Sequence, residues 1–322
     1  MRKRALILGI SGQDGAYLAK YLLDRGYSVV GSSRDPCSQK FFALEYMGLS
    51  SKVEIIKLSL QCPEEICKTL SKIQPDEVYN LAGQTSVAQS FETPLIAYQG
   101  SANSTIFFLE AIRSTSQSVK YFNACSSDCY GDTPHAGATE ETPFRPRSPY
   151  ALGKAIAFWT TKVYREAYGL HVCSAILFSH ESPFRPESFV TQKIIAAVKE
   201  IAAGKRRKLK IGNPDIERDW GWAPDYVSAM HEMLQQERPK DFVIATGESH
   251  KIIDFVQLAF DIEGLDWRAY VKFDAALERP NDVMLSRANP KKVLQELGWK
   301  SKTNFKDVVS GMLAGANEIY TH

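Results

Sequence analysis

The sequence predicts an α/β protein in which a parallel β-sheet carries helices on both of its faces. Three observations lead to this fold class. Short apolar, β-branched runs alternate with amphipathic segments at the spacing of β-α-β units through the first half of the chain. A glycine-rich turn follows the first of these runs. Polar side chains gather after later runs, at the strand ends where a doubly wound sheet binds its ligands.

The predicted strands and helices of the first half follow one another in a regular order. The apolar run 4–10 (RALILGI) indicates a fully buried strand almost at the N-terminus. A glycine turn and an amphipathic helix follow at 11–27, and Gly26 lies near the end of that helix. Further strands are expected at 28–34, 53–60, 77–82 and 120–127, with helices at 62–74 and 104–114.

The second half of the chain is less regular. After about residue 180 the alternation loosens, and four amphipathic segments fit a smaller lobe. These segments are 189–205, 223–235, 251–260 and 290–297. We therefore expect a domain over residues 1–180 and mainly a smaller α/β lobe over residues 181–322, with some of its segments returning to the main sheet.

Composition and charge argue against several classes of partner. The chain has 322 residues and a net charge of +2, so nothing favours nucleic acid or an anionic membrane. No apolar run reaches membrane-spanning length. Three residues separate Cys125 from Cys129, but no second pair stands at a metal-ligand spacing. With no signal peptide, this pattern predicts reduced thiols, no metal and a cytoplasmic protein.

The glycine turn has the spacing Gly9-x-x-Gly12-x-x-Gly15. Glycines allow the backbone to turn tightly and to approach a pyrophosphate, which the N-terminus of the next helix then attracts. A glycine triplet alone is weak evidence, but this one lies between the first strand and the first helix, as the motif requires. The turn therefore predicts a bound dinucleotide.

The end of the second strand indicates which dinucleotide is bound. Ser33 stands where an acidic residue would hold a ribose hydroxyl, and the next residue, Arg34, can accommodate a 2′-phosphate. This favours NADP, although Asp35 adds a negative charge that keeps NAD as the alternative. Asn80 and Ala82, at the end of a later strand, are expected beside the cofactor.

A catalytic group is predicted from two further stretches. In SPYALGK, Tyr150 and Lys154 are four residues apart and share one face of a helix. The lysine can lower the pKa of the phenol, so that the phenolate takes a proton from an alcohol. In NACSSDCYG, Ser126 can hydrogen-bond a substrate oxygen and Asp128 can act as acid or base.

With these motifs in order, the sequence resembles the extended short-chain dehydrogenases/reductases, and within them the GDP-mannose 4,6-dehydratase family. The resemblance extends from the N-terminus to about residue 300. It is carried by GISGQDGAYLAKYLL, PDEVYNLAGQTSVAQSFETP, ETPFRPRSPYALGKAIAFW, YREAYGLHVCSAILFSHESPFRPESFVTQKI, GNPDIERDWGWAPDYVSAM, DFVIATGESH and ERPNDV. The short motifs GQDG, HESP, RDWG and ATGE are typical of the dehydratase branch.

The resemblance implies a Rossmann-type NADP-binding domain, a lobe that binds a GDP-sugar, and a homodimer or homotetramer. It implies conversion of GDP-mannose to its 4-keto-6-deoxy derivative by internal hydride transfer. Tyr150 would accept the proton of the 4-hydroxyl, Lys154 would bind the nicotinamide ribose, Ser126 would contact O4, and Asp128 would act at C5 and C6. The implied cofactor-binding residues are Gly9, Gly12, Gln13, Asp14, Gly15, Arg34, Leu81, Ala82, Tyr150, Lys154, His180 and Arg185. The implied substrate-binding residues are Ser86, Ser179, Glu181, Lys193, Arg218 and Arg279.

Several positions depart from the pattern of the family. Ser126 replaces Thr, Asp128 replaces Glu, Ser179 replaces Asn, Leu58-Ser59 replaces Gly-Asp, and Arg34-Asp35 replaces paired arginines. Because aspartate is one methylene shorter than glutamate, the elimination step depends on the reach of Asp128. The alternatives are therefore a GDP-sugar 4-reductase or C4 dehydrogenase, a dehydratase of a GDP-heptose, and a dinucleotide sensor without activity. The pair Tyr150 and Lys154 argues against the sensor.

Overall fold

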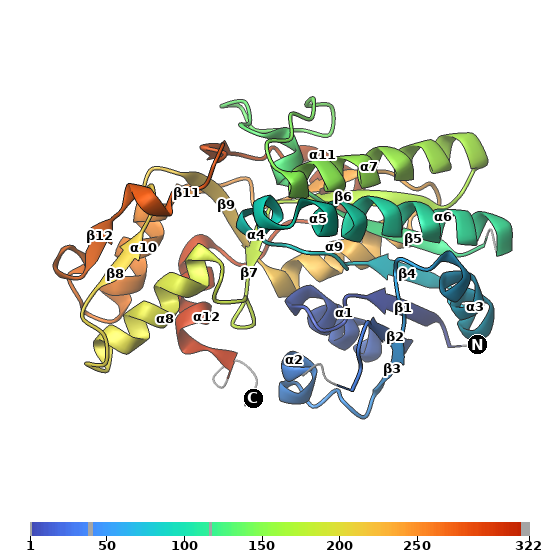
Figure 1. Cartoon of the computed structure of the whole chain (residues 1–322), viewed down its shortest axis with the longest axis horizontal. Coiled ribbons are helices and arrows are strands. Elements are labelled where there is room, and N and C mark those ends of the chain that lie inside the picture. The colour runs from blue at the N-terminus through green and yellow to red at the C-terminus, as the bar shows by residue number, and fades with distance from the viewer. Residues whose placement is uncertain (1, 38–40, 116–117, 317–322) are drawn as a thin grey trace.

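The main sheet contains seven parallel strands (Figure 1). The computed structural model describes residues 2–37, 41–115 and 118–316. The strand order is β10-β6-β5-β4-β1-β2-β3, so the chain starts in the middle of the sheet and proceeds toward both edges. The strands are β1 (Arg4–Leu8), β2 (Ser28–Ser33), β3 (Val53–Lys57), β4 (Glu77–Asn80), β5 (Lys120–Ser126), β6 (Val172–Leu177) and β10 (Phe242–Ile244). The doubly wound Rossmann-type sheet expected from the sequence is confirmed.

Helices cover both faces of this sheet (Figure 1), and successive residues of β1 alternate between them. Ala5 and Ile7 belong to a core formed with α1 (Gln13–Asp24) and α9 (Ala223–Gln235). Leu6 and Leu8 belong to a second core on the opposite face. Helices α3 (Pro63–Ile73), α6 (Ser104–Thr115) and α7 (Pro149–Tyr168) pack there. A central strand buried on both faces explains why residues 4–10 read as a continuous apolar run.

Short helical segments lie in the connections between the strands. They are α2 (Phe42–Tyr46), α4 (Val87–Glu92), α5 (Pro94–Tyr98), a π-helical turn η1 (Gln99–Asn103) and a 3-10 turn η2 (Ser127–Tyr130). The helix predicted at 104–114 is therefore extended backwards, through η1 and α5, to Pro94.

A smaller lobe lies beyond the carboxyl ends of the strands and has a core of its own (Figure 1). Its central strand, β9 (Glu217–Trp222), pairs with β7 (Ser179–Glu181), β11 (Ser249–Lys251) and β13 (Leu285–Ser286). A second ladder joins β8 (Leu209–Ile211) to β12 (Val271–Phe273). The helices of the lobe are α8 (Val190–Ala202), α10 (Ile252–Ile262) and α12 (Phe305–Ala314), with 3-10 turns η3 (Trp267–Ala269) and η4 (Ala275–Leu277).

Two of the four segments that fit the lobe by sequence pack on the main sheet instead. Helix α9 buries Tyr226, Val227 and Met230 in the core that it shares with α1. Helix α11 (Lys291–Leu297) contributes Val293 to the same core. An amphipathic pattern shows that one face of a helix is buried but does not identify the surface that buries it. In the part of the chain that the structure describes, no helix is both long and apolar enough to span a membrane.

Candidate active site

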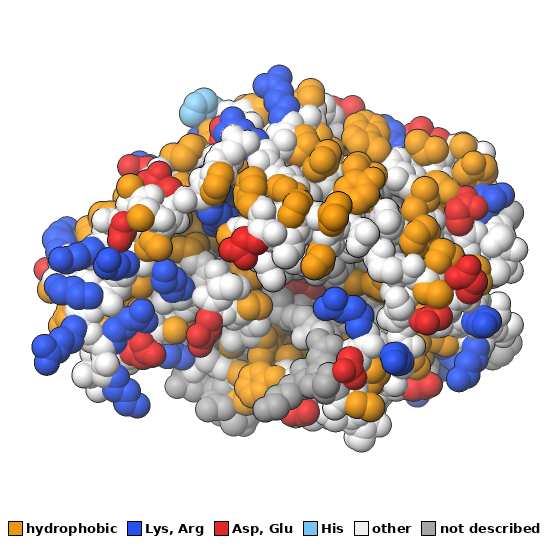
Figure 2. Space-filling view, in the orientation of Figure 1, with side chains coloured by type: hydrophobic (Ala, Val, Ile, Leu, Met, Phe, Trp, Pro, Cys, Tyr) orange, Lys and Arg blue, Asp and Glu red, His pale blue; other side chains and the backbone are white. Residues whose placement is uncertain are grey.

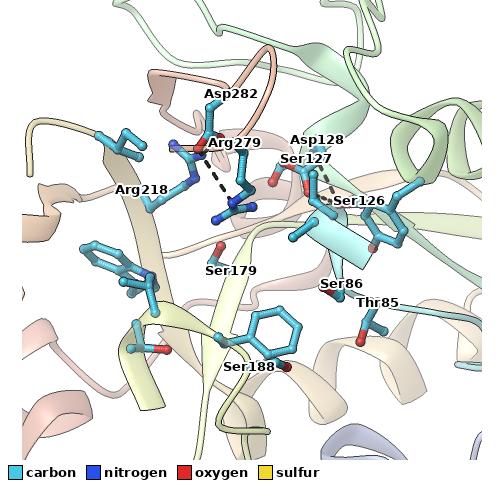
Figure 3. Close-up of a pocket in the computed structure, with 18 of the residues that line it drawn as sticks. Thr85, Ser86, Ser126, Ser127, Asp128, Ser179, Ser188, Arg218, Arg279 and Asp282 are labelled. Carbon is cyan, nitrogen blue, oxygen red and sulfur yellow. Dashed lines mark hydrogen bonds and ion pairs between the residues drawn. The ribbon is translucent and has the colours of Figure 1, made fainter. Parts of the chain in front are cut away.

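A cavity of about 490 Å³ opens at the carboxyl edge of the main sheet, where the sheet meets the lobe. Its walls come from the ends of several strands, from the first turns of α7 and from residues of the lobe. Figure 3 shows Ser126, Ser127 and Asp128 on one side of the cavity and Arg218 and Arg279 on the other. This is the position at which open α/β sheets bind their ligands.

Most of the predicted site residues line this cavity. All four predicted catalytic residues do so: Ser126, Asp128, Tyr150 and Lys154. So do all six predicted substrate residues: Ser86, Ser179, Glu181, Lys193, Arg218 and Arg279. Of the other cofactor residues, Asp14, Leu81, His180 and Arg185 line it, whereas Gly9, Gly12, Gln13, Gly15, Arg34 and Ala82 are not among its lining residues.

The glycines shape the loop before α1. Gly9 has a φ of +84°, which side-chain-bearing residues rarely adopt. A Cβ on Gly15 would lie 2.4 Å from the carbonyl oxygen of Gly9, so a side chain cannot be accommodated there. The loop is thereby folded tightly onto the N-terminus of α1, where Gly12 is the capping residue and has no side-chain oxygen over the first amides. This arrangement fits a pyrophosphate held by backbone N–H groups.

Ser126 and Asp128 are held by the turn that follows β5. Ser126 caps η2: its Oγ accepts a hydrogen bond from the backbone N–H of Asp128 at 3.2 Å. The same hydroxyl donates to Oδ2 of Asp128 at 3.5 Å (Figure 3). The hydroxyl and the carboxylate therefore contact one another at the cavity wall.

Tyr150 begins the helix α7, as its sequence context predicts. Ser148 caps the helix by accepting from the N–H of Ala151, and Pro149 occupies the first turn. Burial raises the pKa of the Tyr150 phenol, the Asp128 carboxylate raises it further, and a hydrogen bond with Ser126 opposes this rise. The phenol is therefore protonated at neutral pH in this arrangement.

Lys154 lies one turn further along the helix and is buried. Its Nζ donates to the carbonyl of Ala124 at 2.8 Å and lies 6.0 Å from the centre of the Tyr150 ring. Burial lowers the pKa of Lys154. The sequence predicts that this lysine lowers the pKa of the phenol, but the pKa of Tyr150 is raised, because burial outweighs the hydrogen bond with Ser126 that lowers it.

His180 and Asp14 form an ion pair inside the site. Nε2 of His180 donates to Oδ2 of Asp14 at 2.9 Å, and Nδ1 donates to the carbonyl of Phe178 at 2.7 Å. Burial alone would lower the pKa of His180, but Asp14 raises it overall. Burial would raise the pKa of Asp14, but His180 lowers it overall. Because both ring nitrogens face oxygen acceptors, the arrangement favours the imidazolium form of His180, and its ring stacks on Tyr226.

Gln13 connects the glycine loop to the segment that contains His180. Its Nε2 donates to the carbonyl of His180 at 3.0 Å, and its Oε1 accepts from Ser182 at 2.8 Å. The side chain of Gln13 thus positions protein groups, and its predicted contact with the cofactor would have to come from its backbone.

Around the second strand, Arg34 is exposed. The carboxylate of Asp35 accepts from the N–H of Cys37 at 3.2 Å and so turns into its own loop. Leu58 is buried in the core beneath α3, and the N–H of Ser59 donates to Glu65. Of the two charged side chains after β2, Arg34 and Asp35, the carboxylate of Asp35 is therefore hydrogen-bonded within its own loop.

The far side of the cavity is cationic. Asp282 lies between the two arginines, 3.4 Å from Nη2 of Arg218 and 3.7 Å from Nε of Arg279 (Figure 3). Burial lowers the pKa of Arg218, and the carboxylates of Asp128 and Asp282 oppose this. Glu181 is engaged by protein groups: it accepts from Thr191 at 2.8 Å and pairs with Arg185 at 3.3 Å.

Sequence reasoning missed Asp282, Thr85 and Ser188, which also line the cavity (Figure 3). In the sequence, Asp282 could have been predicted only from its position three residues after Arg279, where an acid can pair with the arginine. Among the described residues, no group of three or more His, Cys, Asp or Glu side chains could hold a metal ion.

Comparison with known proteins identifies the family. The family model described as GDP-mannose 4,6 dehydratase matches residues 6–312. GDP-mannose 4,6 dehydratase 1 of Arabidopsis thaliana is 43% identical over 322 residues, which cover 97% of this chain and 89% of the relative.

Two solved structures share the fold at lower identity. UDP-glucose 4-epimerase of Thermus thermophilus, in complex with NAD, has a TM-score of 0.85 and 23% identity, with 98% of this chain and 99% of that chain covered. RMD from Pseudomonas aeruginosa, complexed with NADPH, has a TM-score of 0.80 and 22% identity, with the same coverage. With the family match over nearly its whole length, the chain belongs to the GDP-mannose 4,6-dehydratase family.

Proposed function

We propose that this protein is an NADP-dependent GDP-mannose 4,6-dehydratase that forms the 4-keto-6-deoxy sugar by internal hydride transfer. One observation carries the proposal: Ser126, Asp128, Tyr150 and Lys154 line a single cavity whose opposite side holds two arginines. The names of the relatives support this substrate and reaction.

Tyr150 and Ser126 would act in the first step. The phenolate of Tyr150 takes the proton of the sugar 4-hydroxyl, and the Ser126 hydroxyl contacts O4. Lys154 and the glycine loop 9–15 would hold a nicotinamide dinucleotide, which would supply hydride transfer at C4 and C6. Burial raises the pKa of the phenol, and the hydrogen bond with Ser126 lowers it, so the Ser126 hydroxyl favours the phenolate that this step needs.

Asp128 would act in the second step. The 4-keto group makes the hydrogen on C5 acidic, so a carboxylate close to C5 can remove that proton. The resulting acid then gives a proton to the C6 hydroxyl, which leaves as water. The contact between Asp128 and Ser126 keeps this carboxylate beside the hydroxyl that binds O4.

Arg218 and Arg279 would bind the diphosphate of the nucleotide, since guanidinium groups match the geometry of phosphate oxygens. Asp282, between them, pairs with both arginines and offsets the repulsion between their like charges. Lys193, from α8, adds a third positive charge to the cavity wall.

For the cofactor, Arg34 favours NADP because it is exposed at the end of β2 and its neighbour Asp35 is turned into its own loop. The two solved relatives carry NAD and NADPH respectively, so the fold accommodates either dinucleotide.

The second candidate function is a GDP-sugar 4-reductase or C4 dehydrogenase, with a GDP-heptose as an alternative substrate. It is favoured by one observation: Asp128 is one methylene shorter than glutamate, so its carboxylate extends less far toward C5 and C6.

Incubation of the purified protein with GDP-mannose, and in parallel with GDP-heptoses, separates these functions by product mass. Loss of one water with no net change in the redox state of the cofactor supports the dehydratase. A product that has lost two hydrogens, with an equal amount of reduced cofactor, supports the C4 dehydrogenase and contradicts the dehydratase.

We also propose that the protein forms a homodimer or homotetramer through α5, α6 and α7. These helices expose large apolar side chains (Figure 2), an unusual surface for a monomer. The residues are Leu95, Ile96, Tyr98, Ile106, Leu152, Trp159, Val163 and Tyr168. Sedimentation should show an oligomer that Trp159→Asp dissociates and that the control Leu294→Asp, on α11, leaves intact. A monomeric native chain contradicts the proposal.

A further inference from the structure

Two buried thiols flank the catalytic turn. Cys125 is the last residue but one of β5, and Cys129 lies in η2, so Ser126 and Asp128 stand between them. Their Sγ atoms are 3.6 Å apart. The exposed fractions are 3% for Cys125 and 0% for Cys129, so neither thiol faces bulk water. The pair is therefore held in van der Waals contact by the fold itself.

The same thiols contact the helix that carries Tyr150 and Lys154. Sγ of Cys129 donates to the carbonyl of Ala151 at 3.4 Å, and Sγ of Cys125 approaches the carbonyl of Lys154 at 3.8 Å. A displacement of these sulfur atoms therefore affects both the turn that holds Ser126 and Asp128 and the helix that holds Tyr150 and Lys154.

The two thiols differ in access. Both thiols belong to an apolar core that includes Tyr130, Phe158 and Phe178, but of the two only Cys125 also lines the active-site cavity. Burial and the neighbouring Cys125 raise the pKa of the Cys129 thiol, so it reacts as a thiol whose proton leaves during the attack. A small oxidant in the cavity thus meets Cys125 first, with Cys129 behind it.

We propose that Cys125 and Cys129 are a modification site: a hydroperoxide oxidises them to a disulfide that inactivates the enzyme. Sγ of Cys125 attacks one peroxide oxygen, the O–O bond breaks, and a sulfenic acid and water form. Sγ of Cys129 then attacks the sulfur of Cys125, its proton leaves with the sulfenic oxygen as water, and the S–S bond forms. With hydrogen peroxide, two thiols lose two hydrogens and the peroxide becomes two waters.

The disulfide changes the geometry of the catalytic turn. An S–S bond is about 2.05 Å long, so the sulfur atoms must approach from 3.6 Å. The backbone on both sides of Ser126 and Asp128 must follow, and the contacts of the thiols with α7 are lost. A misplacement of about 1 Å at catalytic groups lowers activity about a hundredfold, which is the loss expected here.

The test exposes the native protein to hydrogen peroxide and then alkylates its remaining thiols after denaturation. Trypsin releases both cysteines in the peptide 121–147, because Pro146 blocks cleavage after Arg145. We expect this peptide to lose two hydrogens and to take up no alkylating group. Dithiothreitol should restore two alkylated cysteines and the activity together. The mass measurement needs no substrate, so it tests the disulfide independently of the proposed reaction.

Matched variants locate the effect. Cys125→Ala should form no disulfide, and its activity after peroxide treatment should equal the activity of the same variant before treatment. Cys129→Ala should stop at a sulfenic acid on Cys125, which dimedone traps. Cys173→Ala removes a buried thiol of β6 outside the pair and should respond as the native protein does. The proposal is overturned if the treated native peptide still takes up two alkylating groups, or if Cys125→Ala loses activity like the native protein.

Discussion

His180 and Asp14 are 166 positions apart in the chain, yet their side chains form an ion pair of 2.9 Å inside the active site. The pair joins the N-terminus of α1, where the cofactor phosphates are expected, to the segment between the main sheet and the lobe. The second ring nitrogen of His180 donates to the carbonyl of Phe178, so the ring is held from both sides. This geometry favours the charged form of both partners.

Asp14→Asn should reduce stability in a pH-dependent way. The folded-state pKa of His180 is raised, so its stabilising contribution is complete below its unfolded pKa of about 6.5 and is lost as pH rises through the folded value. Asp14 has a lowered pKa, so its contribution is lost as pH falls below about 4. The difference in unfolding free energy between native protein and variant should be largest between about pH 4 and 6.5, near ~3 kcal/mol, and shrink above that window.

Denaturant unfolding followed from pH 5 to pH 9 measures this difference. Asp24→Asn, at the other end of α1, is the matched control, because Asp24 forms an exposed pair with Lys20. The control should change stability little at any pH. A difference for Asp14→Asn that stays constant from pH 5 to pH 9 would show that His180 is not held as a cation.

Tyr150→Phe should lower turnover by about 10²–10⁴-fold, the usual contribution of a general acid or base. Binding of the nucleotide sugar should persist, because the phenol acts on the reacting hydroxyl and contributes little to affinity in the ground state. Tyr168→Phe is the control, since Tyr168 is exposed at the far end of the same helix. Activity within a few-fold of the native enzyme would remove Tyr150 from the role of base.

Arg34→Ala should weaken NADP far more than NAD, because only NADP carries the 2′-phosphate that the guanidinium would meet. A hydrogen bond to a charged group contributes ~1.5–3 kcal/mol, so we expect an affinity loss of about tenfold to a hundredfold for NADP alone. Titration of each dinucleotide by fluorescence or calorimetry measures it, with Arg25→Ala at the end of α1 as the control. Equal losses for both dinucleotides contradict the assignment of NADP.

Features set by neighbouring residues could be predicted from the sequence. The spacing of Tyr150 and Lys154 predicts one helix face, and both residues lie in the first turns of α7. The position of Gly15 after a buried strand predicts a tight loop, and a Cβ there would collide with Gly9. The position of Ser126 and Asp128 at the end of a strand predicts that they lie in the cavity, because parallel strands share one carboxyl edge.

Features set by distant residues could not be predicted in this way. Asp282 meets Arg218 across 64 positions, and no local pattern specifies that contact. The pKa of Tyr150 depends on burial by several elements, which a pair of residues four apart does not reveal. The amphipathic pattern of helix α9 fits the surface of either domain. The helix packs on the main sheet because its apolar face is buried in the core that it shares with α1.

Asp128 decides between the two candidate reactions, and its substitution separates oxidation from elimination. If the protein is a dehydratase, Asp128→Asn keeps the size of the side chain but removes the base that takes the C5 proton. Oxidation at C4 depends on Tyr150 and should continue, so the variant should accumulate reduced cofactor and a 4-keto sugar that retains its C6 oxygen. Absorbance at the wavelength of reduced nicotinamide and the mass of the sugar nucleotide report these two products separately.

Asp128→Glu completes the test, because it lengthens the side chain by one methylene without changing its charge. A glutamate carboxylate extends one methylene further than that of Asp128, so it should approach C5 and C6 at least as well. We expect Asp128→Glu to keep or increase the rate of water loss, whereas Asp24→Glu, in the exposed pair at the end of α1, should leave it unchanged. The native enzyme could release no water from GDP-mannose or a GDP-heptose while Asp128→Glu does. That result would show that the shorter Asp128 prevents elimination and limits this chain to oxidation or reduction at C4. If neither releases water while both reduce the cofactor, the dehydratase proposal is wrong.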